Sequence, residues 1–149
     1  MSEAALRKAL ADSIVETLDA MFFTSCMGDP DPEGAPPEIA AQVAFEGVRP
    51  GRLTVRMTAR AARSMAANFL GEEEDDVSER QIGDVLCELA NMLCGFVLSR
   101  VEGAEELRLG APRMVENGGP AAGAIVNAVE TGCGVLKAAL EMEGRICPP

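Results

Sequence analysis

The chain contains three polar residues, Asp84, Glu88 and Asn91, in a stretch whose apolar residues recur with helical periodicity. Residues spaced i, i+4 and i+7 share one face of an α-helix, so the three side chains are expected to point the same way. Gly95 continues this line by one more turn. A carboxylate could bind a cationic group of a partner, and a neutral amide could hold a water molecule, because an amide both donates and accepts hydrogen bonds.

Asn91 is an unfavourable residue for the middle of a helix. Its short side chain competes for backbone hydrogen bonds, which costs roughly a few tenths of a kcal/mol or more. A functional role would account for this cost. The alternative is a solvated helix face that carries an ordinary asparagine, and the spacing alone leaves both interpretations open.

The helix that must position these residues is predicted from Ser78 to Val101. Ser78 and Gln81 have the spacing of a capping box, and the acidic run 72–76 suits the positive end of the helix dipole. The face opposite the polar line is apolar and must pack against another element. It contains Ile82, Val85, Leu86, Leu89, Leu93, Phe96 and Val97.

A first helix is predicted from Glu3 to about Phe23. Its polar side carries Asp12, Glu16 and Asp19, which repeat the spacing of the later polar line with a carboxylate in place of the amide. An ancestral repeat and a chance acidic face both explain this pattern. Its apolar side contains Leu6, Leu10, Ile14, Leu18 and Met21.

Alternating apolar residues between the two helices predict a β-hairpin, with strands at 39–45 and 53–57. Thr58 can cap a short helix that Gly71 ends. The buried stripe of this helix is expected to contain Ala62, Met65, Ala66, Phe69 and Leu70.

A short strand at 107–109 and a second hairpin, with strands at 124–130 and 135–143 joined by the turn 131–134, are predicted after the long helix. The two halves share the order of a helix followed by a hairpin. The predicted fold class is therefore α/β (α+β), with duplicated helix-plus-hairpin halves and long helices packed on one face of a largely antiparallel sheet.

Length and composition suit one domain, residues 1–149, large enough to bury a core. We expect neither a signal peptide nor a membrane span, because the sequence has no basic-then-apolar leader and no uninterrupted apolar run near 18 residues. The expected location is cytoplasmic.

Five cysteines and no histidine argue against a disulfide framework, a metal site and a histidine general base. Cys87 and Cys94 flank the polar line and are interpreted as small buried hydrophobic residues rather than reactive thiols. A formal net charge of −11 argues against nucleic acid as a partner and favours a folded partner with a basic or metal-bearing face.

The pattern Asp84-x-x-x-Glu88-x-x-Asn91, followed by Gly95 and Pro112, resembles the signature of the CheC/CheX family of chemotaxis phosphatases. The segments GRLTV at 51–55, MAANFLG at 65–71 and ELANM at 88–92, with the closing pair of strands, extend the resemblance to a CheX-type domain over nearly the whole chain.

This resemblance implies a phosphatase that acts on the phosphoaspartate of a CheY-like response-regulator receiver domain. Glu88 would contact the receiver's active-site lysine, and Asn91 would orient the attacking water. Asp84, Gly95 and Pro112 would be supporting residues. No cofactor or metal is expected on this chain, because the family leaves Mg²⁺ to the receiver.

The chain departs from the CheC pattern on the first helix, where Glu16 and Asp19 occupy the place of a second site. An anionic Asp19 would be repelled by a phosphoryl group, so this site is interpreted as degenerate. One site per chain resembles CheX, whose members form homodimers through sheet edges.

The rival hypothesis is a non-catalytic interaction module related to flagellar switch components. The intact Glu88 and Asn91 pair argues against it. A ligand-sensing or metal-binding domain is a more remote alternative, because no cluster of metal ligands is present.

Overall fold

The fold is described from a computed structural model, for residues 2–21, 26–28, 38–47, 49–101, 107–116, 120 and 122–142. Three parts of the sequence predictions lie outside these residues: the expected end of the first helix at 22–23, the last strand residue 143 and Cys147.

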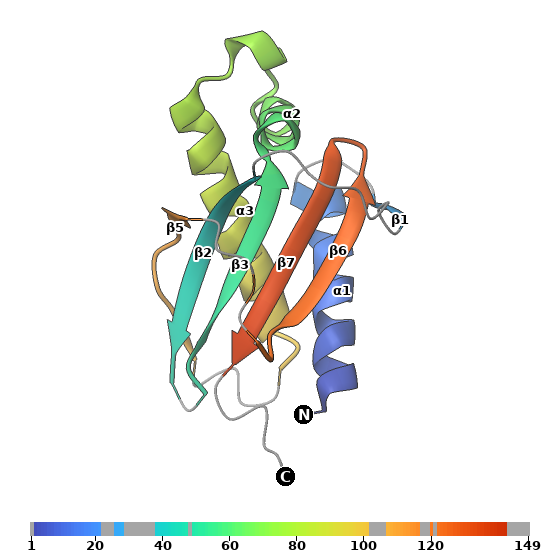
Figure 1. The fold of residues 1–149 in the computed structure, drawn as a ribbon, viewed down its shortest axis with the longest axis vertical. Helices are drawn as coiled ribbons and strands as arrows, with labels where there is room; N and C mark the ends of the chain where they lie inside the picture. The colour runs from blue at the N-terminus through green and yellow to red at the C-terminus, as the bar shows by residue number, and fades with distance from the viewer. Residues whose placement is uncertain are drawn as a thin grey trace.

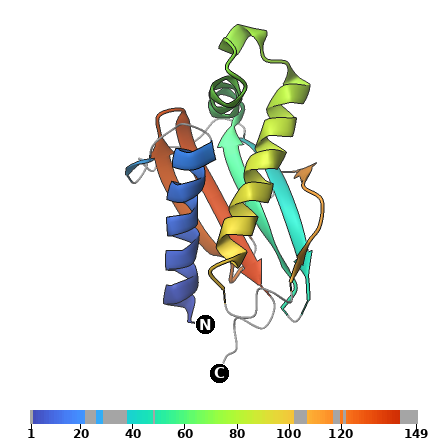
Figure 2. The ribbon, with the colours of Figure 1, turned by 180° about the vertical axis from the view of Figure 1, so that it is seen from behind.

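A twisted antiparallel sheet forms one layer of the structure, the two long helices pack on one of its faces, and the short helix lies at one end of the sheet (Figures 1 and 2). The helices are α1 (Glu3–Met21), α2 (Ala59–Leu70) and α3 (Glu79–Leu98), with a 3₁₀ turn at Glu74–Asp76. The strands are β1 (Cys26–Gly28), β2 (Glu38–Glu46), β3 (Gly51–Thr58), β4 (Arg108–Leu109), β5 (Arg113–Val115), β6 (Ile125–Thr131) and β7 (Gly134–Met142).

The two hairpins meet in the middle of the sheet. Among the described residues the strand order is β1-β6-β7-β3-β2-β4, and β5 also pairs with β2. Leu53 of β3 lies opposite Val43 of β2 on one side and Leu140 of β7 on the other. The predicted fold class and the packing of both long helices on one sheet face are confirmed.

The core lies between the sheet and the helices. Alternation in β3 directs Leu53, Val55 and Met57 into it, and all three are fully buried. Helix α1 contributes Leu6, Leu10, Ile14 and Leu18, each with no exposed surface. Six of the seven apolar residues predicted for α3 are buried, and Phe96 is half-buried.

Helix α3 begins where the sequence predicts. The Ser78 hydroxyl accepts a hydrogen bond from the Gln81 amide at 3.1 Å, and the Gln81 side chain accepts one from the Ser78 amide at 2.8 Å. This capping box satisfies two backbone donors that the first turn would otherwise leave free. Helix α3 is long and apolar enough to cross a membrane by length and composition, but its apolar side belongs to the core between the helices and the sheet.

Helix α2 also has its predicted ends. Thr58 caps it by accepting a hydrogen bond from the Ala61 amide, and Gly71 ends it in a left-handed conformation with φ of 69°. Leu70 was expected in the buried stripe but is exposed. Leu70 is the last residue of α2, and the chain that follows it, residues 71–76, is exposed as well.

Candidate functional site

The polar line on α3 lies on the side of the helix that faces away from the core. Asp84 and Glu88 are exposed and Asn91 is half-buried, whereas Leu86, Leu89 and Leu93 on the opposite side are at most 2% exposed. Three fully packed leucines hold the helix against rotation. The exposed acid and amide are therefore presented one turn apart on a fixed backbone.

The side chains of Glu88 and Asn91 have no hydrogen bond or ion pair with any residue that the structure describes. Asp84 lies 4.0 Å from Arg80, and both of these side chains are mostly exposed. Such a contact is screened by water and holds neither side chain firmly. The amide of Asn91 and the carboxylate of Glu88 are thus available to an incoming partner.

The two supporting residues lie in different elements. Gly95 continues the exposed line of α3, and a Cβ atom placed there would meet nothing within 4 Å. Because Gly95 has no side chain, the helix backbone beside Asn91 is not covered by a side chain at this position. Pro112 is half-buried in the connection between β4 and β5, and β5 contacts α3 where Met114 approaches Gly83.

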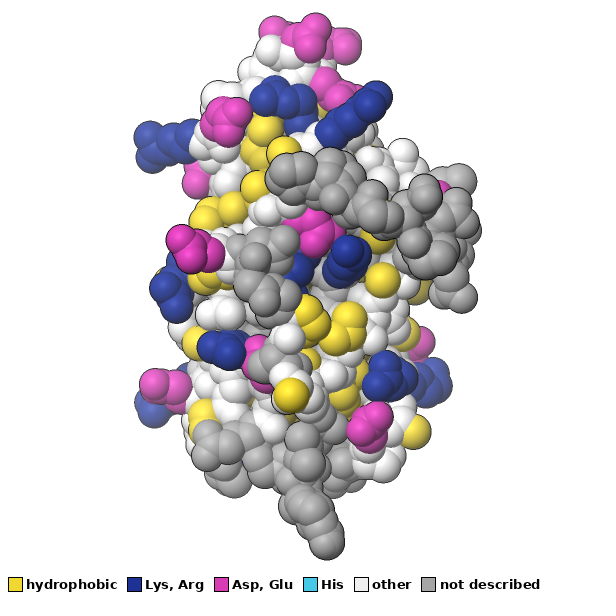
Figure 3. All heavy atoms as spheres, viewed as in Figure 1, with side chains coloured by type: hydrophobic (Ala, Val, Ile, Leu, Met, Phe, Trp, Pro, Cys, Tyr) yellow, Lys and Arg dark blue, Asp and Glu magenta, His cyan; other side chains and the backbone are white. Residues whose placement is uncertain are grey.

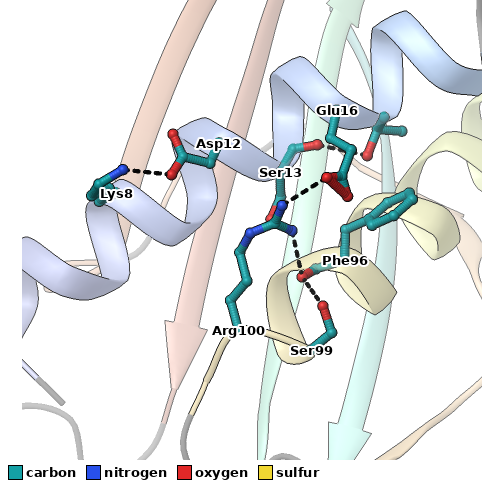
Figure 4. Close-up of polar contacts among 8 residues, drawn as sticks. Lys8, Asp12, Ser13, Glu16, Phe96, Ser99 and Arg100 are labelled. Carbon is teal, nitrogen blue, oxygen red and sulfur yellow. Dashed lines mark hydrogen bonds and ion pairs between the residues drawn. The ribbon is translucent and has the colours of Figure 1, made fainter.

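The first helix has a different environment, because Glu16 makes an ion pair with Arg100 of the same chain (Figure 4). Arg100, just beyond the end of α3, donates a hydrogen bond to Glu16 Oε2 at 2.9 Å. The same guanidinium donates to the buried Ser13 hydroxyl and to the carbonyl oxygen of Phe96, both at 3.1 Å. Glu16 therefore ties α1 to α3, while Asp19 is exposed.

The resemblance to the CheC/CheX family implies dephosphorylation of a receiver, and changing Glu16 or Asp19 to alanine is expected to leave that activity nearly unaltered, because Arg100 holds one side chain and the other would repel a phosphoryl group. Glu16→Ala should lower the melting temperature slightly, since it leaves Arg100 without its carboxylate, whereas Asp19→Ala should not. Thermal unfolding and phosphate-release rates measure the two effects. A loss of activity as large as that of Asn91→Ala, in a folded variant, would contradict the assignment of the working site to α3.

The cysteines beside the polar line are not activated. Cys94 is fully buried, and this burial raises the pKa of its thiol to about 12. Burial, and secondarily the negative charge of Asp84, raise the pKa of Cys87. Both thiols stay protonated near neutral pH, and the thiolate is the reactive form.

In the folded protein at pH 8, Cys94 is expected to remain unmodified by iodoacetamide, and Cys87 to react more slowly than it does after denaturation. Peptide mass spectrometry before and after unfolding in urea measures both. Fast labelling of Cys94 in protein that retains its helical circular dichroism would show that the inner side of α3 opens.

No group of three metal-ligating side chains occurs among the described residues. The geometry thus offers an acid and an amide but no metal centre of its own within that part of the chain. Such a pair can position a water molecule and contact a cation.

Two features of this region could not be found from local sequence patterns. Arg100 contacts Glu16 from 84 positions away, and Met114 contacts Gly83 from 31 positions away. Helical periodicity relates residues that are three or four apart, so it carries no signal for either contact.

Comparisons with known proteins were made for sequence and for structure. The family model described as "Chemotaxis phosphatase CheX" matches residues 39–129, which is more than half of the chain. A search of curated protein sequences found no significant match.

Solved structures with the same fold include the chemotaxis protein CheX from Vibrio vulnificus, with a TM-score of 0.75 and 16% identity over 96% of this chain and 99% of that one. A CheX–CheY–BeF₃–Mg²⁺ complex from Borrelia burgdorferi contains a similar chain, with a TM-score of 0.72 and 14% identity over 91% of this chain and 96% of that one. A CheC-like superfamily protein from a Shewanella species has a TM-score of 0.66 at 17% identity, with coverage of 94% and 98%. At these identities the likeness establishes the fold.

Proposed function

Because this chain belongs to the CheX family of chemotaxis phosphatases, we propose that it hydrolyses the phosphoaspartate of a CheY-like receiver domain. The Borrelia relative was crystallised with CheY, which supports a receiver as the partner here. The observation that carries the proposal is the pair of unengaged side chains, Glu88 and Asn91, on the outer face of α3.

Asn91 is proposed to orient the attacking water. An amide can accept a hydrogen bond from water through its oxygen and donate one to a phosphoryl oxygen through its nitrogen. Hydrolysis of an acyl phosphate is already downhill, so positioning can supply the catalysis without a side chain of shifted pKa. The absence of histidine is therefore no obstacle.

In the proposed reaction, the water oxygen attacks phosphorus in line with the bond to the aspartate oxygen. That bond breaks, the aspartate carboxylate leaves with the bonding electrons, and the proton from water leaves with inorganic phosphate. Mg²⁺ carried by the receiver would neutralise charge on the phosphoryl oxygens. This chain's contribution is to hold the water with Asn91 and to exclude bulk solvent with the surface of α3.

Glu88 is proposed to dock the receiver by pairing with the lysine of its active site. The carboxylate lies one turn from Asn91 and is exposed, so it can reach a cation beside the phosphorylated aspartate. An ion pair formed as water leaves the interface is a charge-assisted hydrogen bond.

Gly95, Asp84 and Pro112 are proposed to support this contact. The open space over Gly95 lets a partner approach the helix backbone beside Asn91, and a larger side chain there would hold the partner away. Asp84 extends the acidic line towards the start of α3. Pro112 fixes the chain between the two short strands that border β2.

The test is phosphate release from phosphorylated receivers encoded near this chain in its genome, each with Mg²⁺, in the presence and absence of the protein. Acceleration of one or more receivers is expected. If none is accelerated but a receiver binds, the chain is the non-catalytic interaction module of the rival hypothesis.

A further inference from the structure

A groove of about 330 Å³ lies beside the first turns of α3, where α2 and β5 approach that helix. Its apolar lining comes from Ile39 of β2, Ile82 of α3 and Met114 of β5, and its basic lining from Arg60 and Arg63 of α2. Met114 is 41% exposed, which is high for a large apolar side chain beside a core. The chain therefore presents an apolar hollow with a basic rim.

Gly83 keeps this groove open. It lies inside α3, where glycine is less favourable than alanine, and its φ angle is not positive. A Cβ atom there would lie 3.7 Å from Met114 Cγ and 3.8 Å from its sulfur, which is ordinary contact. Neither the backbone nor the packing requires glycine at this position. What the missing side chain provides is room between α3 and Met114.

The groove lies within reach of a partner that contacts Asn91. Gly83 is adjacent to Asp84 and eight positions before Asn91, a distance of about 12 Å along a helix that rises about 1.5 Å per residue. A standard protein interface buries about 800 Å² on each partner, which corresponds to a patch of about 16 Å radius. A receiver centred on Asn91 would therefore cover the groove as well as the polar line.

The charged residues that line the groove favour particular surfaces of such a partner over others. Glu79 contributes one carboxylate to the lining, against the two arginines. Arg63 donates hydrogen bonds to the carbonyl oxygens of Glu74 and Val77 and is held in place, and Arg60 is exposed. On a chain with a net charge of −11, the lining of this groove carries two arginines against one carboxylate, and Figure 3 shows both basic and acidic side chains beside the apolar ones near the α2 end of that face. The two arginines are complementary to a carboxylate on the surface of the partner.

We propose that this groove is a second anchor point for the receiver, which inserts an apolar side chain flanked by a carboxylate between Met114 and α3. This inference rests on the proposed function, since the occupant is the same receiver. The polar line would perform the chemistry, and the groove would supply affinity and selection among receivers, because buried apolar anchors in pockets carry much of the binding energy of an interface.

The test uses a CheY-like receiver loaded with Mg²⁺ and beryllofluoride as the phosphorylated mimic, and measures its dissociation constant together with the rate constant of phosphate release at saturating phosphorylated receiver. Gly83→Leu fills the groove, Met114→Asp replaces its apolar wall with a charge, and Arg60→Glu reverses its rim. Each variant should weaken binding about tenfold while the rate constant at saturation changes less than twofold. Gly83→Leu should melt no lower than the parent.

Val126→Asp is the matched control. Val126 is 36% exposed on a strand, close to the exposure of Met114, and lies on the opposite sheet face, since its neighbour Ile125 is buried in the core. This variant should bind as the parent does. If all three groove variants bind as the parent does and the parent is active, the groove is not an anchor point, and the proposed phosphatase activity stands. If the groove variants bind more weakly and the parent binds the receiver without hydrolysing its phosphoryl group, the groove is supported as an anchor point and the proposed phosphatase activity is wrong. A parent that neither binds nor hydrolyses would overturn both.

Discussion

Replacement of Asn91 by alanine is expected to lower the rate constant of receiver dephosphorylation by about 10²-fold or more, the scale of losing a positioning or stabilising group in an active site. Alanine removes both the donor and the acceptor that would hold the attacking water. The effect should appear at saturating receiver, because it concerns the chemical step.

Binding and folding should largely survive this change. The side chain of Asn91 has no hydrogen bond to another described residue, and alanine is the better helix former. The measurement is phosphate release from a Mg²⁺-bound phosphorylated receiver over a range of receiver concentrations, alongside a thermal melt.

Asn68→Ala provides the control for Asn91→Ala, since Asn68 is an exposed helical asparagine on α2, away from the polar line. It should leave the rate constant unchanged. If Asn91→Ala accelerates a receiver as well as the parent does, the water-positioning mechanism is wrong.

Replacement of Glu88 by alanine is expected to act mainly on affinity. A carboxylate that meets a receiver lysine in a partly desolvated interface makes a charge-assisted hydrogen bond of about 1.5–3 kcal/mol. Its loss should raise the dissociation constant by about 10-fold to 100-fold, since about 1.4 kcal/mol corresponds to a factor of ten. The rate constant at saturation should change much less.

The binding of a beryllofluoride-loaded receiver measures this effect directly, and its dependence on salt adds a second measurement. Because the contact is between charges, the difference between the parent and Glu88→Ala should shrink as ionic strength rises. Glu73→Ala removes the same charge from an exposed position in the acidic stretch before α3 and should change affinity little. Equal losses in the two variants would mean that overall charge, rather than the Glu88 contact, attracts the receiver.

Arg100 gives the first helix a structural role that the sequence pattern did not indicate. The prediction of a degenerate site rested on Asp19 and the repulsion of a phosphoryl group. The structure adds that Glu16 already has a partner, with Arg100 bonded to the buried Ser13 hydroxyl at the same time (Figure 4). A receiver lysine would have to displace this arginine to use Glu16.

The sequence by itself determined the three helices and the two hairpins and most of the residues on their inward sides, but not the short strands β1 and β5. The capping residues act on backbone groups within one helical turn. The starts of α2 and α3 and the end of α2 could therefore be predicted from the types of Thr58, Gly71 and the pair Ser78 and Gln81. The periods of helices and strands likewise separated Leu86, Leu89 and Leu93 from the polar line, because burial follows periodicity within one element.

Only the tertiary structure decided how these elements meet. Three features join residues that are far apart in the chain: the pairing of β3 with β7, the contact of Arg100 with Glu16 and the groove between Gly83 and Met114. Such contacts depend on how the sheet twists and where each helix crosses it, which are properties of the whole packed core. A single sequence encodes them only through the combined energy of many contacts, and no spacing along the chain corresponds to them.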